Sequence, residues 1–546
     1  MEKFKPGDRA LPPDSALKVR GRPALKDDDF GSDVGLVDLG CTNPFGEVQN
    51  NKYWHAAVCQ DGQGRWWVYK EWGGVGAKNP QRQYVLCDDE AGARKFFQAE
   101  ARSKNVKRAV VSADGKWTPK PGEDLYRVIA LTARTWGLPD ARTIRVVDGG
   151  QKAPSPSPTS VATAPRKASG LDQKTAALLR DLNVGTIDYA RSSMASGLIP
   201  TQTAIDDGRS LLDEAVDRIG QLGDIRVEAA VQDSSLQRLT REFYSRIPYK
   251  MRGEGMGQKI DVVKWNLTKD NVFLRRQDLD AFEAALAGEA ATSSAVDVAD
   301  ALIATLNARL AFVDPASPAG RWLYDWAPKA TLNRHGNVGG MRVRNVWSVA
   351  RAGEEDAFFR AVVRIGKARR GRFSEKALHV PATRPDLEPE MSDAYRMANA
   401  APLFHGTRSV NVAGIMRLGL LLPKALKGVT ITGAMFGGGN YFADDWKKAA
   451  GYTSLSGSYW SSGSGGIQGR GAFMFVTDVA CGEPFVAPGP SGYTAPPGGR
   501  DSILGKGSNV DARHNSGVLN NEWITFAPEA GEARRCLRYL VEFDAR

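Results

Sequence analysis

Cysteine is scarce in this chain, with only five in 546 residues. The five are Cys41, Cys59, Cys87, Cys481 and Cys536. Their number is odd, they are widely scattered and no two form a CxxC pair, which argues against a disulfide framework and against a cysteine zinc site. The histidines do not cluster at metal-ligand spacing either. We therefore predict no metal.

Long hydrophobic runs are missing as well. No stretch reaches the roughly 18 consecutive apolar residues that a membrane-spanning helix needs. The N-terminus also has no apolar core of the kind found in signal peptides. We expect a soluble, intracellular protein with no membrane partner, nuclear in a eukaryote and cytoplasmic or in the nucleoid in a bacterium.

Positive charge is in excess. The hydrophobic content of 42% and the charged content of 25% are those of a globular protein, but the net charge is +11 and the pI is near 9.3. Net charge concerns association rather than fold, and an excess of this sign favours a polyanionic partner. Nucleic acid is the leading candidate.

The pattern of apolar residues changes along the chain. Residues 52–76 alternate aromatic and β-branched with polar residues around Gly-containing turns, which predicts a small antiparallel sheet, and residues 90–105 predict one short helix. A segment rich in Pro, Ser, Ala and Thr, 151–170, is typical of an extended linker.

A helical period follows the linker. Leu236, Leu239, Phe243 and Ile247 share one helix face before Pro248, and similar patterns predict a helical bundle from about 171 to 314. Beyond it, six short strands are expected at 343–351, 401–407, 440–445, 471–479, 521–526 and 537–543. The fold class is thus multidomain α+β.

The stretch FGGGNYFADD, at 436–445, sets three glycines beside a Tyr-Phe pair and two acids. Bare backbone of this kind suits a flexible loop that enters a strand, or a ligand that lies flat on the chain. The run lacks the Lys-Ser/Thr of a phosphate loop and the spacing of a dinucleotide fingerprint. Alone, it leaves both readings open.

Three motifs in order distinguish the C-terminal region. His405-Gly406-Thr407 ends an apolar strand, the glycine run leads to Tyr441, and Glu522 lies in the sequence VLNNEWITF. This order resembles the ADP-ribosyltransferase domain of the poly(ADP-ribose) polymerases, with its His-Tyr-Glu triad, over residues 324–546.

The resemblance implies a mixed α+β catalytic domain that uses NAD+ as co-substrate, without a metal. His405, Tyr441 and Glu522 would be the triad. Gly406 would bind the nicotinamide carboxamide through its backbone, and Tyr441 and Tyr452 would enclose the ring. The NAD-binding residues implied are Gly406, Thr407, Tyr452, Phe442, Gly437, Gly438 and Gly439, the three glycines letting the chain pass the dinucleotide without side chains.

The chemistry expected of Glu522 can also be argued directly. Cleavage of the bond between ribose and nicotinamide passes through an oxocarbenium-like transition state, which a carboxylate near the sugar stabilises. The same carboxylate can accept a proton from an incoming hydroxyl. Glu522 suits both roles, which favours polymer formation over single transfer.

Three positions depart from the family pattern. Ala449 stands where a Ser usually donates to the nicotinamide amide, Ala434 replaces a Tyr common in the DNA-activated members, and Leu421 stands where an Arg often reaches toward the adenosine. These changes bear on NAD affinity and not on the type of reaction.

The two upstream regions resemble other parts of the same family. Residues 175–194 and 239–249 look like the helical regulatory domain, which blocks productive NAD access until DNA binds; a bundle without a regulatory role is the alternative. Trp72 and Gly73 match the WGR domain, in which the Trp packs on a DNA end, but Gly74 replaces its Arg. The DNA-binding residues expected are Trp72, Lys52, Arg65, Lys70, Lys78 and Arg82.

The sequence therefore predicts a DNA-break-stimulated ADP-ribosyltransferase that modifies proteins, itself included, and elongates poly(ADP-ribose). The expected domains are an N-terminal tail (1–35), a WGR domain (36–112), an extension and linker (113–170), a helical regulatory domain (171–314) and a catalytic domain (315–546). A mono(ADP-ribosyl)transferase, or a DNA-end-binding protein with weak catalytic activity, are the alternatives.

Overall fold

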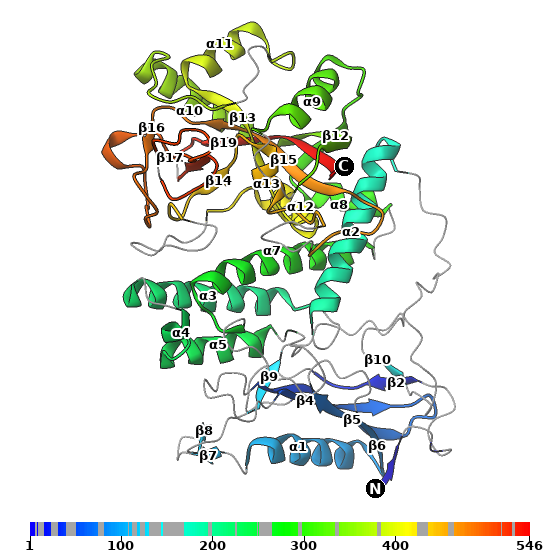
Figure 1. Ribbon diagram of the computed structural model, residues 1–546. Coiled ribbons are helices and arrows are strands. Elements are labelled where there is room, and N and C mark those ends of the chain that lie inside the picture. The colour runs from blue at the N-terminus through cyan, green and yellow to red at the C-terminus, as the bar shows by residue number, and fades with distance from the viewer. Residues whose placement is uncertain are drawn as a thin grey trace. The chain divides into compact units, whose positions relative to one another are not determined.

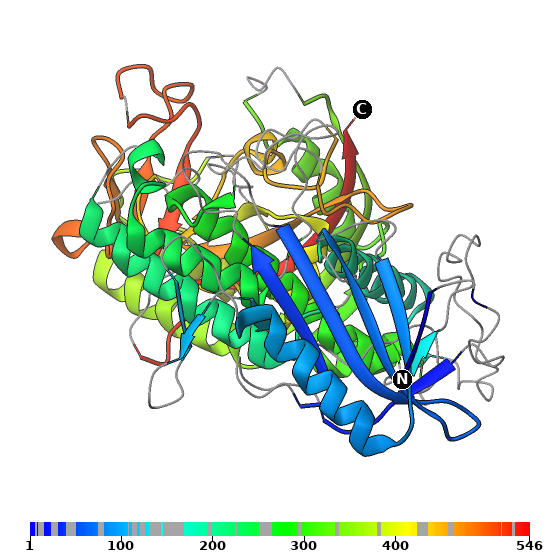
Figure 2. The ribbon, with the colours of Figure 1, turned by 90° about the horizontal axis from the view of Figure 1, so that it is seen from below.

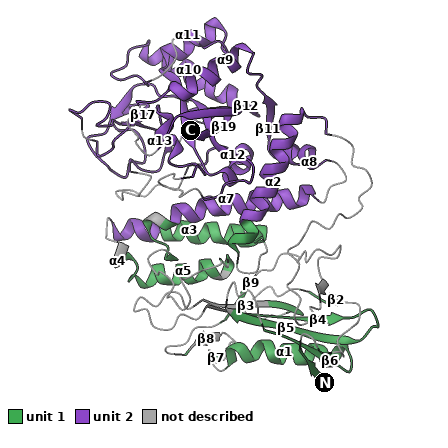
Figure 3. Cartoon of the chain, turned by 45° about the vertical axis from the view of Figure 1, so that its right-hand side comes forward, with its two compact units in different colours: residues 1–165, 190–215, 226–271 green, residues 166–189, 216–225, 272–546 purple. Residues whose placement is uncertain are grey.

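The structure, a computed structural model, divides into two compact units (Figures 1 and 3). It describes residues 1–5, 8, 16–22, 31–39, 51–74, 81–106, 109–111, 117–120, 126–129, 143–145, 169–194, 199–223, 227–247, 249, 265–292, 297–332, 338–378, 384–422, 435–456, 464–514, 516–526 and 530–545. One unit comprises 1–165, 190–215 and 226–271, and the other comprises 166–189, 216–225 and 272–546.

The first unit is built on an antiparallel sheet in the order β1-β6-β5-β4-β2-β10, with β3 pairing with β4 and β9. Its strands are β1 (Glu2–Phe4), β2 (Ala16–Val19), β3 (Asp33–Leu39), β4 (Asn51–Gln60), β5 (Trp66–Gly74), β6 (Gln81–Cys87), β9 (Arg127–Ile129) and β10 (Thr143–Arg145), and a separate pair is β7 (Ala109–Val111) with β8 (Trp117–Pro119). The antiparallel sheet predicted for this part is confirmed.

Helix α1 (Glu90–Val106) crosses one face of this sheet (Figure 2). Phe97 and two alanines of the helix lie in the same apolar cluster as Trp54 and Val68 of the sheet. This packing explains why the apolar residues of 90–105 recur at helical spacing, and the predicted helix is confirmed.

The helical region consists of α2 (Gln173–Ser193), α3 (Gln202–Leu222), α4 (Val227–Ala230), α5 (Ser234–Arg246), α7 (Lys269–Thr292) and α8 (Val298–Thr305). The four residues predicted to share a face of α5 are all at most 2% exposed. Asp233 caps that helix by accepting a hydrogen bond from the backbone N–H of Leu236. The residue ranges of the two units divide α2, α3 and α7.

The second unit holds two sheets. The five-stranded sheet has the order β11-β12-β19-β15-β13, and the four-stranded sheet has the order β14-β18-β17-β16. The elements are β11 (Ala308–Phe312), α9 (Pro318–Lys329), β12 (Met341–Arg351), α10 (Glu354–Arg369), α11 (Pro389–Met397), β13 (Ala400–Gly406), η1 (Ser409–Asn411), α12 (Val412–Leu418), β14 (Asn440–Phe442), α13 (Trp446–Ala450), β15 (Ala472–Ala480), β16 (Pro484–Val486), η2 (Pro497–Gly499), β17 (Ser502–Gly505), β18 (Glu522–Thr525) and β19 (Arg535–Ala545). All six predicted strands are present.

One boundary differs from the prediction. The helical region was expected to reach residue 314, but β11 pairs along its whole length with β12 and is an edge strand of the catalytic sheet. Helices α2 and α8 also contribute to the core of this unit, because Leu179 and Leu302 lie in one apolar cluster with Trp347 and Phe475. The catalytic sheet and these helices therefore share a single core.

Candidate active site

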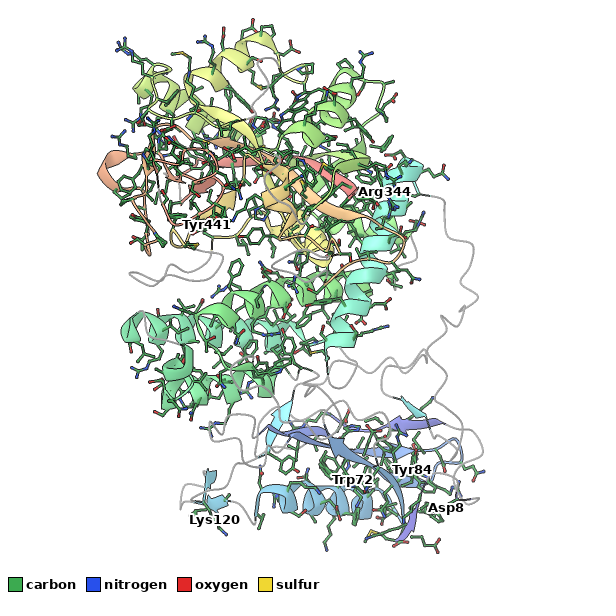
Figure 4. All side chains as sticks on the ribbon, viewed as in Figure 1. Asp8, Trp72, Tyr84, Lys120, Arg344 and Tyr441 are labelled. Atoms are coloured by element: carbon green, nitrogen blue, oxygen red, sulfur yellow. The ribbon has the colours of Figure 1, made fainter. Side chains whose placement is uncertain are left out.

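The three predicted triad residues lie where the two sheets of the second unit meet. His405 is near the end of β13, Tyr441 lies on β14 (labelled in Figure 4), and Glu522 opens β18. Strand β14 pairs with β18, and the backbone groups of Ala443 and Phe404 exchange two hydrogen bonds of 2.8 and 2.9 Å. This bridge joins β14 to β13 and so brings the three motifs together.

His405 is held by the backbone of β14. Its Nδ1 lies 3.0 Å from the carbonyl oxygen of Tyr441. Because a carbonyl can only accept, Nδ1 carries the proton in the neutral ring and Nε2 is left as an acceptor. Burial lowers the pKa of His405 below its ordinary value of 6.5, so the ring is neutral at neutral pH.

Glu522 forms an ion pair with Lys448, which the sequence reasoning did not identify. The carboxylate lies 2.6 Å from Lys448 Nζ, and the two side chains are 8% and 16% exposed. Burial alone would lower the pKa of Lys448, but the charge of Glu522 and contact with Tyr452 raise it above its ordinary value. The ammonium group lies over the Tyr452 ring at 5.5 Å.

The spacing of Lys448 could have suggested this contact. Lys448 and Tyr452 are four residues apart, at the end of the short helix α13, and such a spacing places two side chains on one face. The partner Glu522 is distant in sequence, however, so the ion pair itself depends on how β18 pairs with β14.

Gly406 is required for the approach of α13 to β13. A Cβ at this position would lie 1.8 Å from the carbonyl oxygen of Ala449. Ala449 is 3% exposed, and this contact places it directly against the backbone predicted to bind the carboxamide. Thr407 is also buried, and its hydroxyl lies 3.5 Å from the amide nitrogen of Asn411.

Two glycines of the run are needed for packing within the protein. A Cβ at Gly437, where φ is +91°, would lie 1.8 Å from the carbonyl oxygen of Tyr493, and a Cβ at Gly439 would meet Ile524. Gly438 donates its N–H to the same Tyr493 carbonyl. Packing within the protein therefore requires glycine at 437 and 439, and the predicted passage of the three glycines past NAD+ stays a prediction.

Tyr441 is fixed by the same loop. Its hydroxyl donates to the carbonyl oxygen of Gly437 at 2.8 Å and accepts from the N–H of Phe436 at 2.9 Å. Burial raises the pKa of Tyr441 well above its ordinary value, so the phenol is neutral. Phe442 is 3% exposed and its ring lies 5.9 Å from that of His405, so it packs behind the site.

Several buried polar atoms after His405 have no partner among the described residues. They are Arg408 Nε, Ser409 Oγ and Asn411 Oδ1, and Asn440 Oδ1 beside Tyr441 is a fourth. A buried polar atom without a hydrogen bond costs about 1–3 kcal/mol. A polar ligand can supply such bonds, and Asn440 beside Tyr441 is placed to offer one to the NAD+ that the sequence predicts.

Arg408 joins the segment after His405 to two helices of the helical region. Its guanidinium lies 2.9 Å from Asp278 of α7 and donates to the hydroxyl of Tyr189 of α2 at 2.8 Å. Tyr189 donates to Asp278 at 2.7 Å, and Arg275 binds the other carboxylate oxygen. The side chains of Asp278 and Arg408 are 5% and 10% exposed. We call Arg408, Asp278, Tyr189 and Arg275 the Arg408 cluster.

The first unit carries the second candidate site. Trp72 is half-buried on β5, opposite Trp54 of β4, and is labelled in Figure 4. Arg65 keeps 36% of its side chain exposed beside Asp61. Gly74 pairs with Lys52 across the sheet.

Two of the side chains expected to contact DNA form ion pairs within the first unit. Lys70 is 6% exposed and its ammonium group pairs with Glu100 of α1 at 3.1 Å, while Arg82 pairs with Glu71 at 2.7 Å. The first pair links the sheet to α1 and the second links β6 to β5, and contact of either side chain with phosphates stays a prediction. The side chain of Lys52, and Lys78 and Ala434 altogether, lie outside the described residues.

Two more properties concern the described part of the chain. It contains no helix that is long and apolar enough to cross a membrane. Nor do its His, Cys, Asp and Glu side chains form a group of three or more that could hold a metal ion.

Comparison with protein-family models finds two matches. Residues 327–528 match the poly(ADP-ribose) polymerase catalytic domain, and residues 40–115 match the WGR domain. No curated protein matches the chain. A catalytic domain of this family indicates an NAD+ ADP-ribosyltransferase, and WGR domains are associated with nucleic-acid binding. The chain thus combines a poly(ADP-ribose) polymerase catalytic domain with a WGR domain, as its sequence predicts.

Proposed function

We propose that the protein is a DNA-break-stimulated enzyme that transfers ADP-ribose from NAD+ to proteins, itself included, elongates the product to poly(ADP-ribose) and releases nicotinamide. One observation carries the proposal: the buried Glu522–Lys448 ion pair of 2.6 Å at the sheet junction that also holds Tyr441 and a neutral His405. A carboxylate fixed at such a place can act on a sugar ring and on an incoming hydroxyl.

The bond between the ribose C1′ and the nicotinamide nitrogen breaks in this reaction, and nicotinamide leaves with the electron pair. His405 Nε2 accepts a hydrogen bond from a ribose hydroxyl, and Gly406 binds the carboxamide while Tyr441 and Tyr452 enclose the ring. Glu522 stabilises the positive charge that develops on the ribose. An acceptor oxygen then bonds to C1′, and its proton passes to Glu522.

Glu522→Gln tests this mechanism. The exchange keeps the shape of the side chain but removes its charge and its basicity, so polymer should be lost while NAD+ binding remains. Transfer of labelled NAD+, with polymer length resolved on a gel, measures the first effect, and equilibrium binding measures the second. Undiminished chain extension by the variant would exclude Glu522 from the mechanism.

The same assay separates the alternatives. Wild-type product that remains a single unit would indicate a mono(ADP-ribosyl)transferase, and DNA binding without transfer would indicate an end-binding protein. Adding and omitting nicked duplex DNA shows whether strand breaks stimulate turnover. Single-unit product would overturn chain elongation alone, whereas DNA binding without transfer would overturn the enzymatic function.

We infer that the WGR domain binds the DNA end. Trp72 would pack on the sugar-phosphate, and Arg65, whose side chain stays partly exposed, would contact phosphates. Contacts of this kind are independent of sequence and weaken as salt concentration rises. Because Gly74 replaces the family arginine, we expect only modest coupling between DNA binding and turnover.

We also infer that the helical region restrains the catalytic domain. The Arg408 cluster supports this, because it connects the segment that follows His405 to α2 and α7 through buried charges. A restraint that DNA binding releases would make turnover depend on DNA.

A further inference from the structure

Two adjacent acids, Asp444 and Asp445, follow the Tyr-Phe pair of the active-site loop. They are only 3% and 1% exposed, and the mechanism above does not use them. Buried carboxylates are costly unless other groups bind them, so their partners show what they stabilise.

Asp444 binds both neighbours of Glu522. Its Oδ2 accepts hydrogen bonds from Asn521 Nδ2 at 2.8 Å and from Trp523 Nε1 at 3.2 Å. The backbone N–H of Leu378 lies 3.4 Å from the same oxygen. A single buried carboxylate therefore binds the residue on each side of Glu522.

Asn521 is also bound on its other side. Its side-chain oxygen accepts a hydrogen bond from the N–H of Gly507 at 3.0 Å, and the residue is 3% exposed. With its nitrogen on Asp444 and its oxygen on Gly507, this amide cannot turn without breaking a buried bond. The residue before Glu522 is thereby fixed in one orientation.

Asp445 binds the start of α13, the helix that carries Lys448. Its Oδ1 accepts from the backbone N–H of Lys447 at 2.8 Å and of Lys448 at 3.4 Å. Its Oδ2 accepts from the Thr331 hydroxyl at 3.1 Å and the Leu332 N–H at 2.9 Å.

A helix as short as α13 is not stable by itself, since isolated helices need about 12–15 residues to be even marginally stable in water. Asp445 supplies the N-terminal cap and ties it to the segment at 331–332. Removing such a cap would let the helix, and with it Lys448, change position.

We propose that Asp444 and Asp445 are positioning residues that hold the two halves of the Glu522–Lys448 ion pair, Asp444 the carboxylate and Asp445 the ammonium group. The proposal rests on the transferase function proposed above. It explains why two acids follow Tyr441, Phe442 and Ala443, since one loop then orients the tyrosine, the glutamate and the lysine together.

Asp444→Asn tests the first half. The amide keeps an oxygen that can accept, but without the charge its bonds weaken and Asn521 and Trp523 are no longer held firmly. Because small misplacements of catalytic groups cost up to about 100-fold in rate, we expect kcat to fall by about tenfold or more. The KM for NAD+ should stay within about twofold, since the ring and carboxamide contacts do not involve Asp444.

Asp386→Asn is the matched control. Asp386 is also a carboxylate with a side chain 7% exposed, and it accepts bonds from Arg384 and Tyr539 away from the triad. Both variants should lower the melting temperature, but only Asp444→Asn should lower the kcat of the folded protein. Equal kcat values for both variants would show that Asp444 has only a structural role.

Two milder variants keep the test decisive if Asp444→Asn does not fold. Trp523→Phe removes one donor to Asp444 and should lower kcat with an unchanged KM. Asp445→Asn weakens the cap on α13 and should lower kcat, with a rise in KM as well, because Ala449 and Tyr452 would move with the helix. Combining Asp444→Asn with Lys448→Met should cost less than the sum of the two, because both act on the same carboxylate. Strict additivity would contradict the proposal.

Crystal structures of the variants provide a readout that does not require activity. In Asp444→Asn, Glu522 should move away from Lys448, and in Asp386→Asn the pair should remain. Absence of NAD+ turnover in the wild-type protein would overturn the proposed function, but the movement of Glu522 in Asp444→Asn could still be tested. An unmoved Glu522 in an active protein would overturn the positioning role alone.

Discussion

The restraint attributed to the helical region can be tested with Asp278→Asn. Asp278 is the centre of the Arg408 cluster, where it accepts bonds from Arg408, Arg275 and Tyr189. Burial alone would raise the pKa of Asp278, but the two arginines hold it below its ordinary value of 3.8, so the group is ionised at neutral pH. The substitution leaves both arginines without their shared counter-charge.

The size of the effect follows from burial. Removing one partner of a buried ion pair costs about 3–5 kcal/mol, and about 1.4 kcal/mol corresponds to a tenfold change in an equilibrium constant. A cost of about 3 kcal/mol in the restrained state would therefore shift the equilibrium toward the released state about 100-fold. If about 1% of the protein is released at rest, the variant would be about half released.

Initial rates of NAD+ turnover, with and without nicked duplex DNA, measure this shift. Basal turnover should rise by about 50-fold, and DNA should then stimulate the variant by no more than about twofold, because a ligand can only release what is still restrained. The pKa of Asp278 is lower in the folded protein than the ordinary 3.8, so its ionised form stabilises the fold at all pH values above 3.8. This stabilisation is lost only as pH falls through the lower, folded pKa, so assays near neutral pH report the intact cluster.

Glu242→Gln is the control for this prediction. Glu242 pairs with Arg238 on the exposed surface of α5, where a pair contributes only about 0.3–0.5 kcal/mol, so turnover should not change. A folded Asp278→Asn protein with wild-type basal turnover and wild-type stimulation would refute the restraint. Deleting 171–314 is a poorer test, because it would also remove β11 from the catalytic sheet and uncover the shared core.

Three further outcomes are expected. Trp72→Ala should reduce DNA-stimulated turnover more than basal turnover, and an equal loss of both, with a lowered melting temperature, would indicate a folding defect, since Trp truncation can cost about 3–5 kcal/mol. Because burial lowers the pKa of His405, the fall in kcat that protonation of this residue causes should lie below pH 6.5, and His405→Gln should remove it from the pH profile. The free energy of unfolding should also decrease as pH falls through 6.5, because the unfolded chain then binds the proton more readily than the folded one. Ala449→Ser places a hydroxyl beside Gly406, so the KM for NAD+ should fall by roughly two- to tenfold, which corresponds to about 0.5–1.5 kcal/mol for one hydrogen bond. An unchanged KM would show that Ala449 does not face the carboxamide.

The sequence was sufficient to predict those strands and helices that are determined by their own residues. The strands at 401–407 and 521–526 and the helix at 90–105 are confirmed, because each is a continuous apolar pattern between turn signals. Strand β11 was expected to be helical, since an edge strand of five residues after a helix carries little period of its own, and β16 and β17 are shorter still.

The triad was predictable for a similar reason, and its supporting residues were not. His405, Tyr441 and Glu522 each lie in a recognisable motif, whereas Lys448 acts through a partner 74 positions later in the chain, at 522. Asp444 depends likewise on the pairing of β14 with β18. Such contacts are set by strand register, which no single segment encodes.

The place of the site between two sheets gives these supporting residues their importance. His405 belongs to the five-stranded sheet and Glu522 to the four-stranded one, and within each sheet the ladder of backbone hydrogen bonds fixes a residue firmly. Between the sheets, the described residues offer the two bonds of Ala443 with Phe404 and the contact of His405 with the Tyr441 carbonyl. These contacts between the histidine and the glutamate run through β14, which is only three residues long. Buried carboxylates on the loop that follows β14 lock it onto the strand of the glutamate and the helix of the lysine, so substitutions there should alter the rate of the reaction before they alter the binding of its substrate.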